Sequence, residues 1–243
     1  MELGCGMEDL ERQDGLEALA REDTAESRAL ESTLMEVPGM GEVLVGGDPM
    51  GVADKLNDCQ GNNILNARGD CGLVSVANML TQAGMEVTED EIVVMAVRNR
   101  LCEYSTENDA GENGGTNVLH RQALLNACGL KATIYSDYFG NRMSLEDIAD
   151  CVEAGHGVNI DVNAGYAWND ASYINDGTSN HSIIVTGTLR DPDTGRLKGL
   201  MVCDSGLTNM NSRALPMSVE TLERAYVNVP GASAIVTDRP VCA

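Results

Sequence analysis

The order of helical and strand signals along the chain is the feature that most constrains its fold. Between residues 70 and 155, apolar residues recur at helical spacing and are bounded by capping residues and glycines. From residue 158 onwards, strand-forming residues dominate, in short runs at residues 158–162, 182–186, 200–203 and 234–237. Helices followed by an antiparallel sheet are typical of α+β proteins, so the sequence predicts this fold class.

Several helices are predicted in the first half of this region. Asp70 occupies the position of a helix N-cap before an apolar helical pattern that begins at Cys71. Residues 88–91 and 144–147 are capping boxes, in which a Ser or Thr and a later acidic residue satisfy the first backbone N–H groups of a helix. A further helical pattern begins at Thr116.

Residues 1–47 are expected to be an acidic N-terminal appendage, and residues 48–243 a single domain. Residues 8–36 show a weakly amphipathic helical pattern among many acidic residues. The sequence Gly46-Gly47-Asp48-Pro49 is a strong turn signal, which places the boundary near residue 47 and indicates a flexible joint. The appendage is interpreted as a secretion leader, as a prosegment that contacts the cleft of the domain, or as an arm that binds a partner.

The charge of the chain excludes several classes of partner. Its formal net charge of −22 at pH 7 repels nucleic acid and anionic lipid surfaces, which proteins bind mainly through clustered Lys and Arg. No apolar run approaches the roughly 20 residues of a membrane-spanning helix, and the acidic N-terminus is unlike a signal peptide. We therefore expect a cytoplasmic protein, or one delivered from the cytoplasm by a specialised secretion system.

The 8 cysteines form no CxxC pair, so neither a zinc finger nor a thioredoxin-type motif is encoded. Most of them stand beside apolar residues, as Cys128 and Cys203 do, which is typical of buried, reduced thiols. This usage fits a reducing cytoplasm, and the sequence predicts no metal site.

Cys71 differs from the other cysteines because it stands at the predicted start of a helix, within Gly69-Asp70-Cys71-Gly72. The unpaired N–H groups and partial positive charge of a helix N-terminus favour a thiolate and lower the pKa of a cysteine. The same N–H groups, including that of Cys71, are suited to stabilise an oxyanion, and the flanking glycines leave room for a substrate backbone. Cys71 is therefore the predicted nucleophile.

His181 is the best placed of the three histidines to pair with the Cys71 thiolate. It begins an apolar strand, which fixes its ring, whereas His120 lies on a predicted helix and His156 in a Gly-His-Gly turn. The next strand ends at Asp204, and in an antiparallel pair this end returns beside the start of the first strand. Asp204 is therefore predicted to bind the second ring nitrogen of His181 and to fix its tautomer.

These residues resemble the papain-like cysteine peptidases, and most closely the bacterial branch that includes the bacteriocin-processing, double-glycine-cleaving peptidases. The resemblance rests on Gly-Asp-Cys71-Gly-Leu-Val-Ser-Val-Ala-Asn-Met-Leu, on Asn180-His181-Ser-Ile-Ile-Val-Thr-Gly and on the strand that ends at Asp204, and it covers residues 57–237. It implies a nucleophile helix packed against a small twisted sheet, with a cleft between them. It also implies amide hydrolysis through a thioester intermediate, with a peptide or protein substrate and no metal or organic cofactor.

One position departs from the pattern of that group, whose members usually have a glutamine about six residues before the nucleophile as an oxyanion donor. Here that position is Leu65, and Gln60 lies farther upstream. Gln60 is the candidate donor if an inserted loop brings it to the site, and Asn63 and Asn66 are also near. If nothing replaces the donor, a loss of about 3 kcal/mol of transition-state stabilisation is expected.

The resemblance predicts a thiol peptidase with Cys71 as nucleophile, His181 as base and Asp204 as the residue that orients the base. Two alternatives stay open on the same scaffold. One is a bacterial effector toxin that deamidates or transamidates a target protein with the same Cys and His. The other is an inactive papain-like domain that only binds peptides, which the displaced glutamine favours. The related peptidases cut after paired glycines, so Gly46-Gly47 is also a candidate site of self-cleavage.

Overall fold

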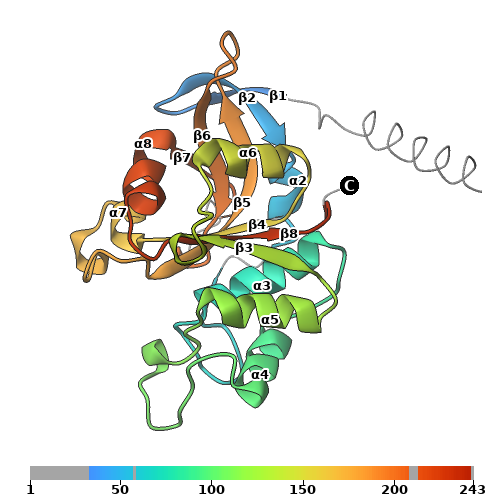
Figure 1. Cartoon of the computed structure of the whole chain (residues 1–243), viewed down its shortest axis with the longest axis vertical. Helices are drawn as coiled ribbons and strands as arrows, with labels where there is room; N and C mark the ends of the chain where they lie inside the picture. The colour runs from blue at the N-terminus through green and yellow to red at the C-terminus, as the bar shows by residue number, and fades with distance from the viewer. Residues whose placement is uncertain (1–32, 57–58, 208–212, 242–243) are drawn as a thin grey trace, which may run out of the picture.

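The computed structural model describes residues 33–56, 59–207 and 213–241, which form an α+β fold (Figure 1). The strands are β1 (Thr33–Val37), β2 (Gly41–Gly47), β3 (Ala132–Ser136), β4 (Val158–Val162), β5 (His181–Arg190), β6 (Leu197–Cys203), β7 (Leu215–Ser218) and β8 (Ser233–Thr237). The α-helices are α2 (Pro49–Ala53), α3 (Cys71–Gln82), α4 (Glu89–Asn99), α5 (Val118–Ala127), α6 (Leu145–Glu153), α7 (Ala164–Trp168) and α8 (Val219–Leu222). Short helical turns of other types are η1 (Ala110–Glu112), η2 (Asp137–Phe139), η3 (Ala171–Tyr173) and η5 (Glu223–Val227).

The strands form an antiparallel sheet around β5. The order along the sheet is β1-β2-β5-β4-β8-β3, with β6 also paired to β5 and β7 paired to β6. One part of β5 pairs with β2 and another part with β4, while β6 pairs with β5 on its other side. All residues of β5 except Arg190 are buried. This explains why the strand reads as a nearly continuous apolar run, since both of its faces are covered.

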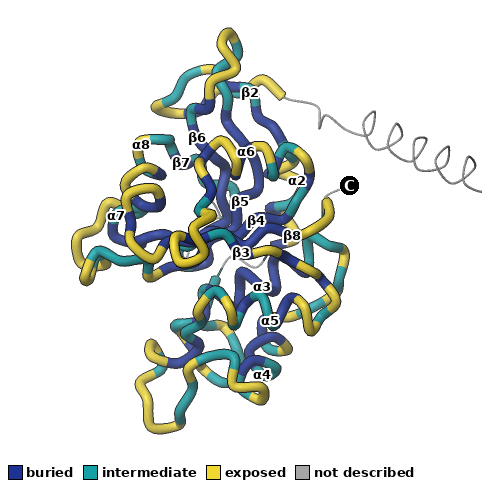
Figure 2. Tube along the Cα trace, viewed as in Figure 1, coloured by how far each residue is buried: buried dark blue, intermediate teal, exposed yellow. Residues whose placement is uncertain are grey.

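Helices cover both faces of the sheet. On one face, α3, α4 and α5 pack against a core that includes Ile184 of β5 and Ile235 of β8. On the other face, α6, α8 and η5 enclose a second core that includes Ile148, Ile160 and Tyr226. Figures 1 and 2 show the strands between these two groups of helices, with the central strands as the most buried part of the trace.

The predicted order of helices and strands is confirmed. The predicted helices correspond to α3, α4, α5 and α6, and the predicted strand segments lie within β4, β5, β6 and β8. Both capping boxes form, because the side chains of Thr88 and Ser144 accept hydrogen bonds from the N–H groups of Glu91 and Asp147. Helix α5 begins slightly later than predicted, because the Asn117 side chain caps it.

Residues 33–47, assigned above to the N-terminal appendage, are part of the sheet. Residues 33–36, at the end of the predicted helical pattern, belong to strand β1, which pairs with β2, and β2 pairs with β5. Val43 and Val45 are buried in a small core with Leu189. The expected boundary therefore falls at the end of a strand that belongs to the sheet. The rest of the predicted appendage lies outside the described residues.

Gly46 and Gly47 belong to this strand pairing, which corrects the expectation of a flexible joint. Gly46 lies opposite Thr188 and Gly47 opposite Gly187 in the register of β2 and β5. A Cβ atom at position 46 would overlap Oγ1 of Thr188, so packing of the sheet requires glycine there. Backbone groups held in a strand pairing are not free to bind a peptidase, which disfavours self-cleavage after these glycines.

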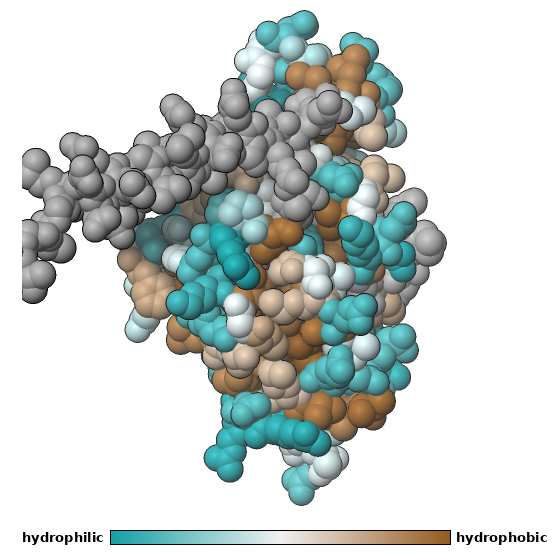
Figure 3. Space-filling model, turned by 90° about the vertical axis from the view of Figure 1, so that its right-hand side faces the viewer, coloured by the Kyte–Doolittle hydropathy of each residue, from teal (hydrophilic) through white to brown (hydrophobic). Residues whose placement is uncertain are grey.

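A few large apolar side chains reach the surface. In the face that Figure 3 shows, apolar residues lie between polar ones. Ile64 and Tyr138 are the most exposed of the large apolar side chains in the described ranges, at 70% and 89%. None of the helices described by the structure has both the length and the apolar character required to cross a bilayer.

Shortening Val43 tests whether β2 is part of the folded core. Because Val43 is fully buried, Val43→Ala should lower the free energy of unfolding by about 1–3 kcal/mol. The matched control is Leu34→Ala in β1, where the side chain is 53% exposed and the change should stay within about 0.5 kcal/mol. Urea unfolding followed by circular dichroism measures both values. Equal, small effects would mean that this segment is an appendage.

Candidate active site

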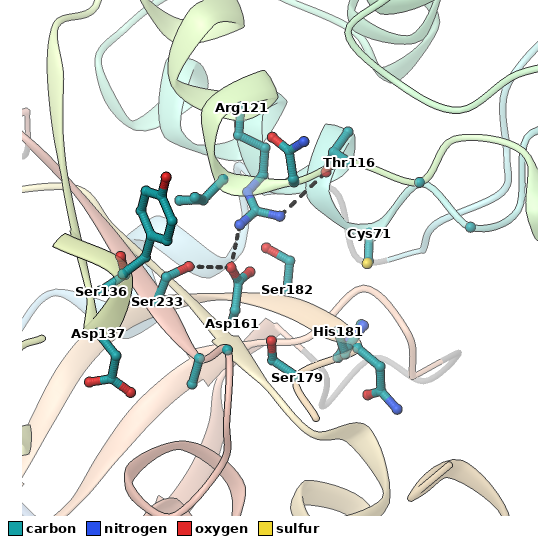
Figure 4. Close-up of a pocket in the computed structure, with 18 residues that line it drawn as sticks. Cys71, Thr116, Arg121, Ser136, Asp137, Asp161, Ser179, His181, Ser182 and Ser233 are labelled. Atoms are coloured by element: carbon teal, nitrogen blue, oxygen red, sulfur yellow. Dashed lines mark hydrogen bonds and ion pairs between the residues drawn. The ribbon is translucent and has the colours of Figure 1, made fainter. Parts of the chain in front are cut away.

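Cys71 is the first residue of α3 and lines a cleft between this helix and the sheet (Figure 4). A helix does not pair the N–H groups of its first turn within itself. Here the N–H groups of Leu73 and Val74 both donate to the carbonyl of Asp70. The N–H group of Cys71, which lines the cleft, therefore stays the candidate oxyanion donor at this helix end.

Asp70 occupies the predicted N-cap position, but its side chain does not cap the helix. Its carboxylate instead accepts hydrogen bonds from the N–H of Gly61 and from Nδ2 of Asn63, at 2.9 and 3.1 Å. Burial, and then a hydrogen bond with Glu89, raise the pKa of Asp70 to about 8. The raised pKa reduces the negative charge that Asp70 places beside Cys71 at neutral pH.

The two glycines around Cys71 are required by packing within the protein. A Cβ atom at position 69 would lie 2.6 Å from the carbonyl oxygen of Gly111. A Cβ atom at position 72 would overlap Oγ1 of Thr116 and lie 3.0 Å from Cδ of Arg121. The interpretation that both glycines leave room for a substrate is therefore wrong for Gly72, which fills a packed position. Gly69 does line the cleft.

His181 and Asp204 are brought together by the pairing of β5 with β6. The two strands are antiparallel with Ile184 opposite Cys203, so the end of β6 returns beside the start of β5. Nε2 of His181 lies 2.6 Å from Oδ1 of Asp204. Because this contact occupies Nε2, Nδ1 is the ring nitrogen left to face Cys71.

The carboxylate of Asp204 is completely buried and receives further hydrogen bonds. Nε1 of Trp168 donates to Oδ2 at 2.7 Å, and the N–H of Gly206 donates to Oδ1 at 2.9 Å. The Trp168 ring also packs against His181, with 5.1 Å between ring centroids. Trp168 was not singled out from the sequence, although a single tryptophan in a chain poor in aromatic residues was an available signal.

The groups of this site shift each other's pKa. For Cys71, burial raises the pKa, but the hydrogen bond and charge of His181, the N–H of Ser182 and the charge of Arg121 outweigh burial and lower it. For His181, burial lowers the pKa, but Asp204 and Cys71 together raise it to about 10. Burial raises the pKa of Asp204, but the charge of His181 and the bonded donors lower it overall. At neutral pH these shifts favour a thiolate, an imidazolium and a carboxylate.

Gln60, predicted from the sequence as an oxyanion donor, does not line this cleft. Its backbone N–H donates to the carbonyl of Ser205 at 2.9 Å, and its side-chain amide donates to the carbonyl of Arg68 at 2.8 Å. Asn63 and Asn66 do not line the cleft either. The structure therefore brings together Cys71, His181 and Asp204, and leaves the loop that carries these amides outside the cleft.

The other two histidines have different surroundings. Nδ1 of His156 lies 2.6 Å from the carbonyl oxygen of Thr237, and His120 on α5 lies beside Asn117. In the part of the chain that the structure describes, no group of three or more His, Cys, Asp or Glu residues is arranged to hold a metal ion.

A buried ion pair that the sequence did not reveal lines another part of the same cleft. Nη2 of Arg121 on α5 contacts Oδ2 of Asp161 on β4, and their side chains are only 4% and 13% exposed. Arg121 stands between His120 and Gln122 in a predicted helix, where a charged residue is usually interpreted as solvent-exposed. The available signal was Asp161 itself, a carboxylate inside a strand that is otherwise buried.

Comparison with known proteins finds few similarities. No family model matches the sequence, and no curated protein matches it. The structure is similar to the crystal structure of a double glycine motif protease from an AMS/PCAT transporter in complex with the leader peptide, with a TM-score of 0.40 and 16% sequence identity. The match covers 70% of this chain and 84% of that chain. That protein belongs to the class of peptidases that the sequence resembles.

Selective alkylation tests the charge state of Cys71. The lowered pKa of Cys71 increases its thiolate fraction at a pH of about 6, whereas burial raises the pKa of Cys102 to about 11 and also raises the pKa of Cys128 and Cys151. Dilute iodoacetamide should therefore modify Cys71 at least about tenfold faster than these three, as measured by peptide mass mapping. His181→Ala should remove this advantage, because loss of the imidazolium raises the pKa of Cys71. Equal rates in the unaltered chain would contradict the thiolate.

Substitution of Gly206 tests whether close packing fixes the position of the His181 ring. A Cβ atom at position 206 would lie 2.6 Å from the Trp168 ring and 2.9 Å from Cε1 of His181. Gly206→Ala should displace the imidazole and slow alkylation of Cys71 by about tenfold at a pH of about 6. The matched control is Gly111→Ala, where an added Cβ meets nothing within 4 Å and the rate should not change. An unchanged rate in a folded Gly206→Ala chain would show that the imidazole position is not sensitive to this contact.

Proposed function

We propose that this protein is a thiol peptidase that hydrolyses an amide bond of a peptide or protein, with Cys71 as nucleophile, His181 as acid and base, and Asp204 as the residue that orients His181. The observation that carries the proposal is the contact of Nε2 of His181 with buried Asp204 beside Cys71, a thiol with a lowered pKa that opens into a cleft. The protein is proposed to act in the cytoplasm, or in a target cell after delivery by a specialised secretion system.

Acylation is the first half of the proposed reaction. The Cys71 thiolate attacks the carbonyl carbon of the scissile amide, and the carbonyl oxygen takes up the negative charge. The N–H group of Cys71 at the helix end is the proposed donor to this oxyanion. As the C–N bond breaks, Nδ1 of His181 transfers its proton to the leaving amine, and the acyl group stays on Cys71 as a thioester.

Deacylation restores the starting charges. Neutral His181 takes a proton from a water molecule, whose oxygen attacks the thioester carbon. The C–S bond then breaks, the acid product leaves, and the thiolate of Cys71 again faces the imidazolium. Asp204 stays ionised throughout and stabilises His181 whenever the ring is charged.

The shape of the cleft suits an extended peptide. Its volume is about 380 Å³, which is within the range of ligand pockets. Small residues, including Gly115, Gly231 and Ala232, form part of its lining. Tyr138 also lines the cleft and is 89% exposed, so it offers apolar surface to a bound chain. These features support the binding of a peptide chain along the cleft.

The position of Gln60 favours a second candidate, a papain-like domain that binds peptides without cutting them. Its amide is bonded to Arg68 and does not line the cleft, so the oxyanion would depend on the N–H group of Cys71 alone. Removing one oxyanion donor costs about 3 kcal/mol of transition-state stabilisation in a peptidase. This candidate retains the same cleft and the same thiolate but predicts no product.

Incubation with a proteome-derived peptide library separates these functions. A peptidase creates new peptide N-termini, and Cys71→Ala should lower their rate of formation by at least about a thousandfold. Asp204→Asn should shift the alkaline limit of activity to lower pH, because loss of the carboxylate lowers the pKa of His181 from about 10. A mass gain on glutamine without a cut would instead indicate deamidation. Peptide binding without any change in mass would indicate the non-catalytic domain.

A further inference from the structure

Four polar side chains form a row across the sheet within the cleft. Ser136 lies on β3, Ser233 on β8, Asp161 on β4 and Ser182 on β5, which are neighbouring strands. Ser136 is opposite Ser233 and Asp161 is opposite Ser182, so each pair points to one face of the sheet. Oγ of Ser233 also contacts Asp161, which joins the two pairs. All four line the cleft, and Figure 4 shows this polar row leading toward His181.

The polar row is connected to the nucleophile through Ser182 and Arg121. The backbone N–H of Ser182 is hydrogen-bonded to Cys71. Arg121 lies over the row, where it pairs with Asp161 and where Nη1 donates to Oγ1 of Thr116 at 3.3 Å. A peptide bound at Cys71 and extending along the cleft therefore passes these groups.

Polar atoms around the row have unused hydrogen-bonding capacity. Nε of Arg121 and Oγ of Ser136 are buried and have no hydrogen-bond partner among the described residues. The hydrogen bonds that Asp161 accepts from Arg121 and Ser233 both reach Oδ2, and no described residue donates to Oδ1. A buried polar group without a partner is unfavourable, so the site is suited to a ligand that supplies both a donor and an acceptor.

A carboxamide supplies this combination. Its N–H group can donate to Oδ1 of Asp161, and its carbonyl oxygen can accept from Arg121 or from the hydroxyl of Ser136. A carboxylate would meet the negative charge of Asp161, and an ammonium group would meet the positive charge of Arg121. An aliphatic side chain would leave the buried polar atoms without partners. The chemistry of the row therefore favours a neutral amide over charged or apolar groups.

We propose that the polar row and Arg121 form a subsite for a glutamine or asparagine side chain of the substrate. This proposal rests on the peptidase function proposed above, since it assumes that a peptide binds along the cleft from Cys71. A backbone amide carries the same donor and acceptor, but binding of a backbone would confer no preference for one side chain. A measured side-chain preference therefore distinguishes the subsite from general peptide binding.

N-acetylated tetrapeptides that end in glycine aldehyde are a suitable probe, because they bind without being hydrolysed. The Cys71 thiolate adds to the aldehyde carbon, and the resulting oxygen takes the proton of His181. One position at a time carries Gln, Glu, Lys or Leu, and binding is measured as protection of Cys71 from iodoacetamide. At one position, Gln should protect at a concentration about tenfold lower than the other three side chains.

Variants of the row connect this preference to the structure. Ser136→Ala and Asp161→Asn should each remove the advantage of Gln and leave protection by the Leu peptide unchanged. The matched control is Ser179→Ala, which removes a hydroxyl group from the same cleft outside the polar row and should keep the preference. Thermal unfolding checks that each variant is folded. Ser136→Ala leaves the Arg121–Asp161 ion pair intact, so this variant alone is sufficient for the test if Asp161→Asn does not fold.

The outcomes separate the two proposals. If the aldehydes protect Cys71 but Gln has no advantage at any position, the subsite is wrong and the peptidase proposal stands. If Gln keeps its advantage in both row variants, the subsite is also wrong, because the amide then binds elsewhere. If no aldehyde protects Cys71 although iodoacetamide modifies it selectively, the cleft does not bind peptides and both proposals fail.

Discussion

The buried contact between His181 and Asp204 is the interaction on which the rest of the candidate site depends. Taking two ionisable groups out of water is costly unless each finds partners, and here Asp204 also receives hydrogen bonds from Trp168 and Gly206. Its negative charge keeps His181 protonated, and the imidazolium in turn favours a thiolate at Cys71. One contact therefore sets the charges of three side chains. The lone tryptophan acts in the same place, since it donates to the carboxylate and packs against the imidazole.

The sheet makes this contact possible because β5 has partners on both sides. On one side β6 brings Asp204 to the first residue of β5, and on the other side β4 brings Asp161 opposite Ser182. Helix α3 packs on the same strand, where Oγ of Ser75 donates to the carbonyl of Ser182 at 3.3 Å. The end of one buried strand thus lies between Cys71, Asp204 and the polar row. A shift of one residue in the pairing of β5 with β6 or with β4 would turn Asp204 or Asp161 to the opposite face of the sheet.

Local signals in the sequence were sufficient for much of the fold and for the arrangement of the main site. Capping boxes and glycines predicted the helices because they act within a few residues of the helix ends. The proximity of His181 and Asp204 followed from strand order, since consecutive antiparallel strands return to the same edge. Strands β1 and β2 were misread as an appendage because their stability comes from pairing with β5. Asp70 is the N-cap residue of α3, as predicted, but its side chain does not cap the helix because it accepts hydrogen bonds from Gly61 and Asn63 instead.

The sequence by itself determined the class of fold, the helix end that carries Cys71, and the strand ends that carry His181 and Asp204. Each of these follows from short-range rules of capping, periodicity and antiparallel return, which need no knowledge of the folded core. Only the tertiary structure decided that Gln60 does not line the cleft and that Arg121 and Asp161 do. Burial and partners set the role of such polar residues, and both depend on which distant segments pack together. The same amino acid is a solvated surface charge in one packing and half of a buried ion pair in another.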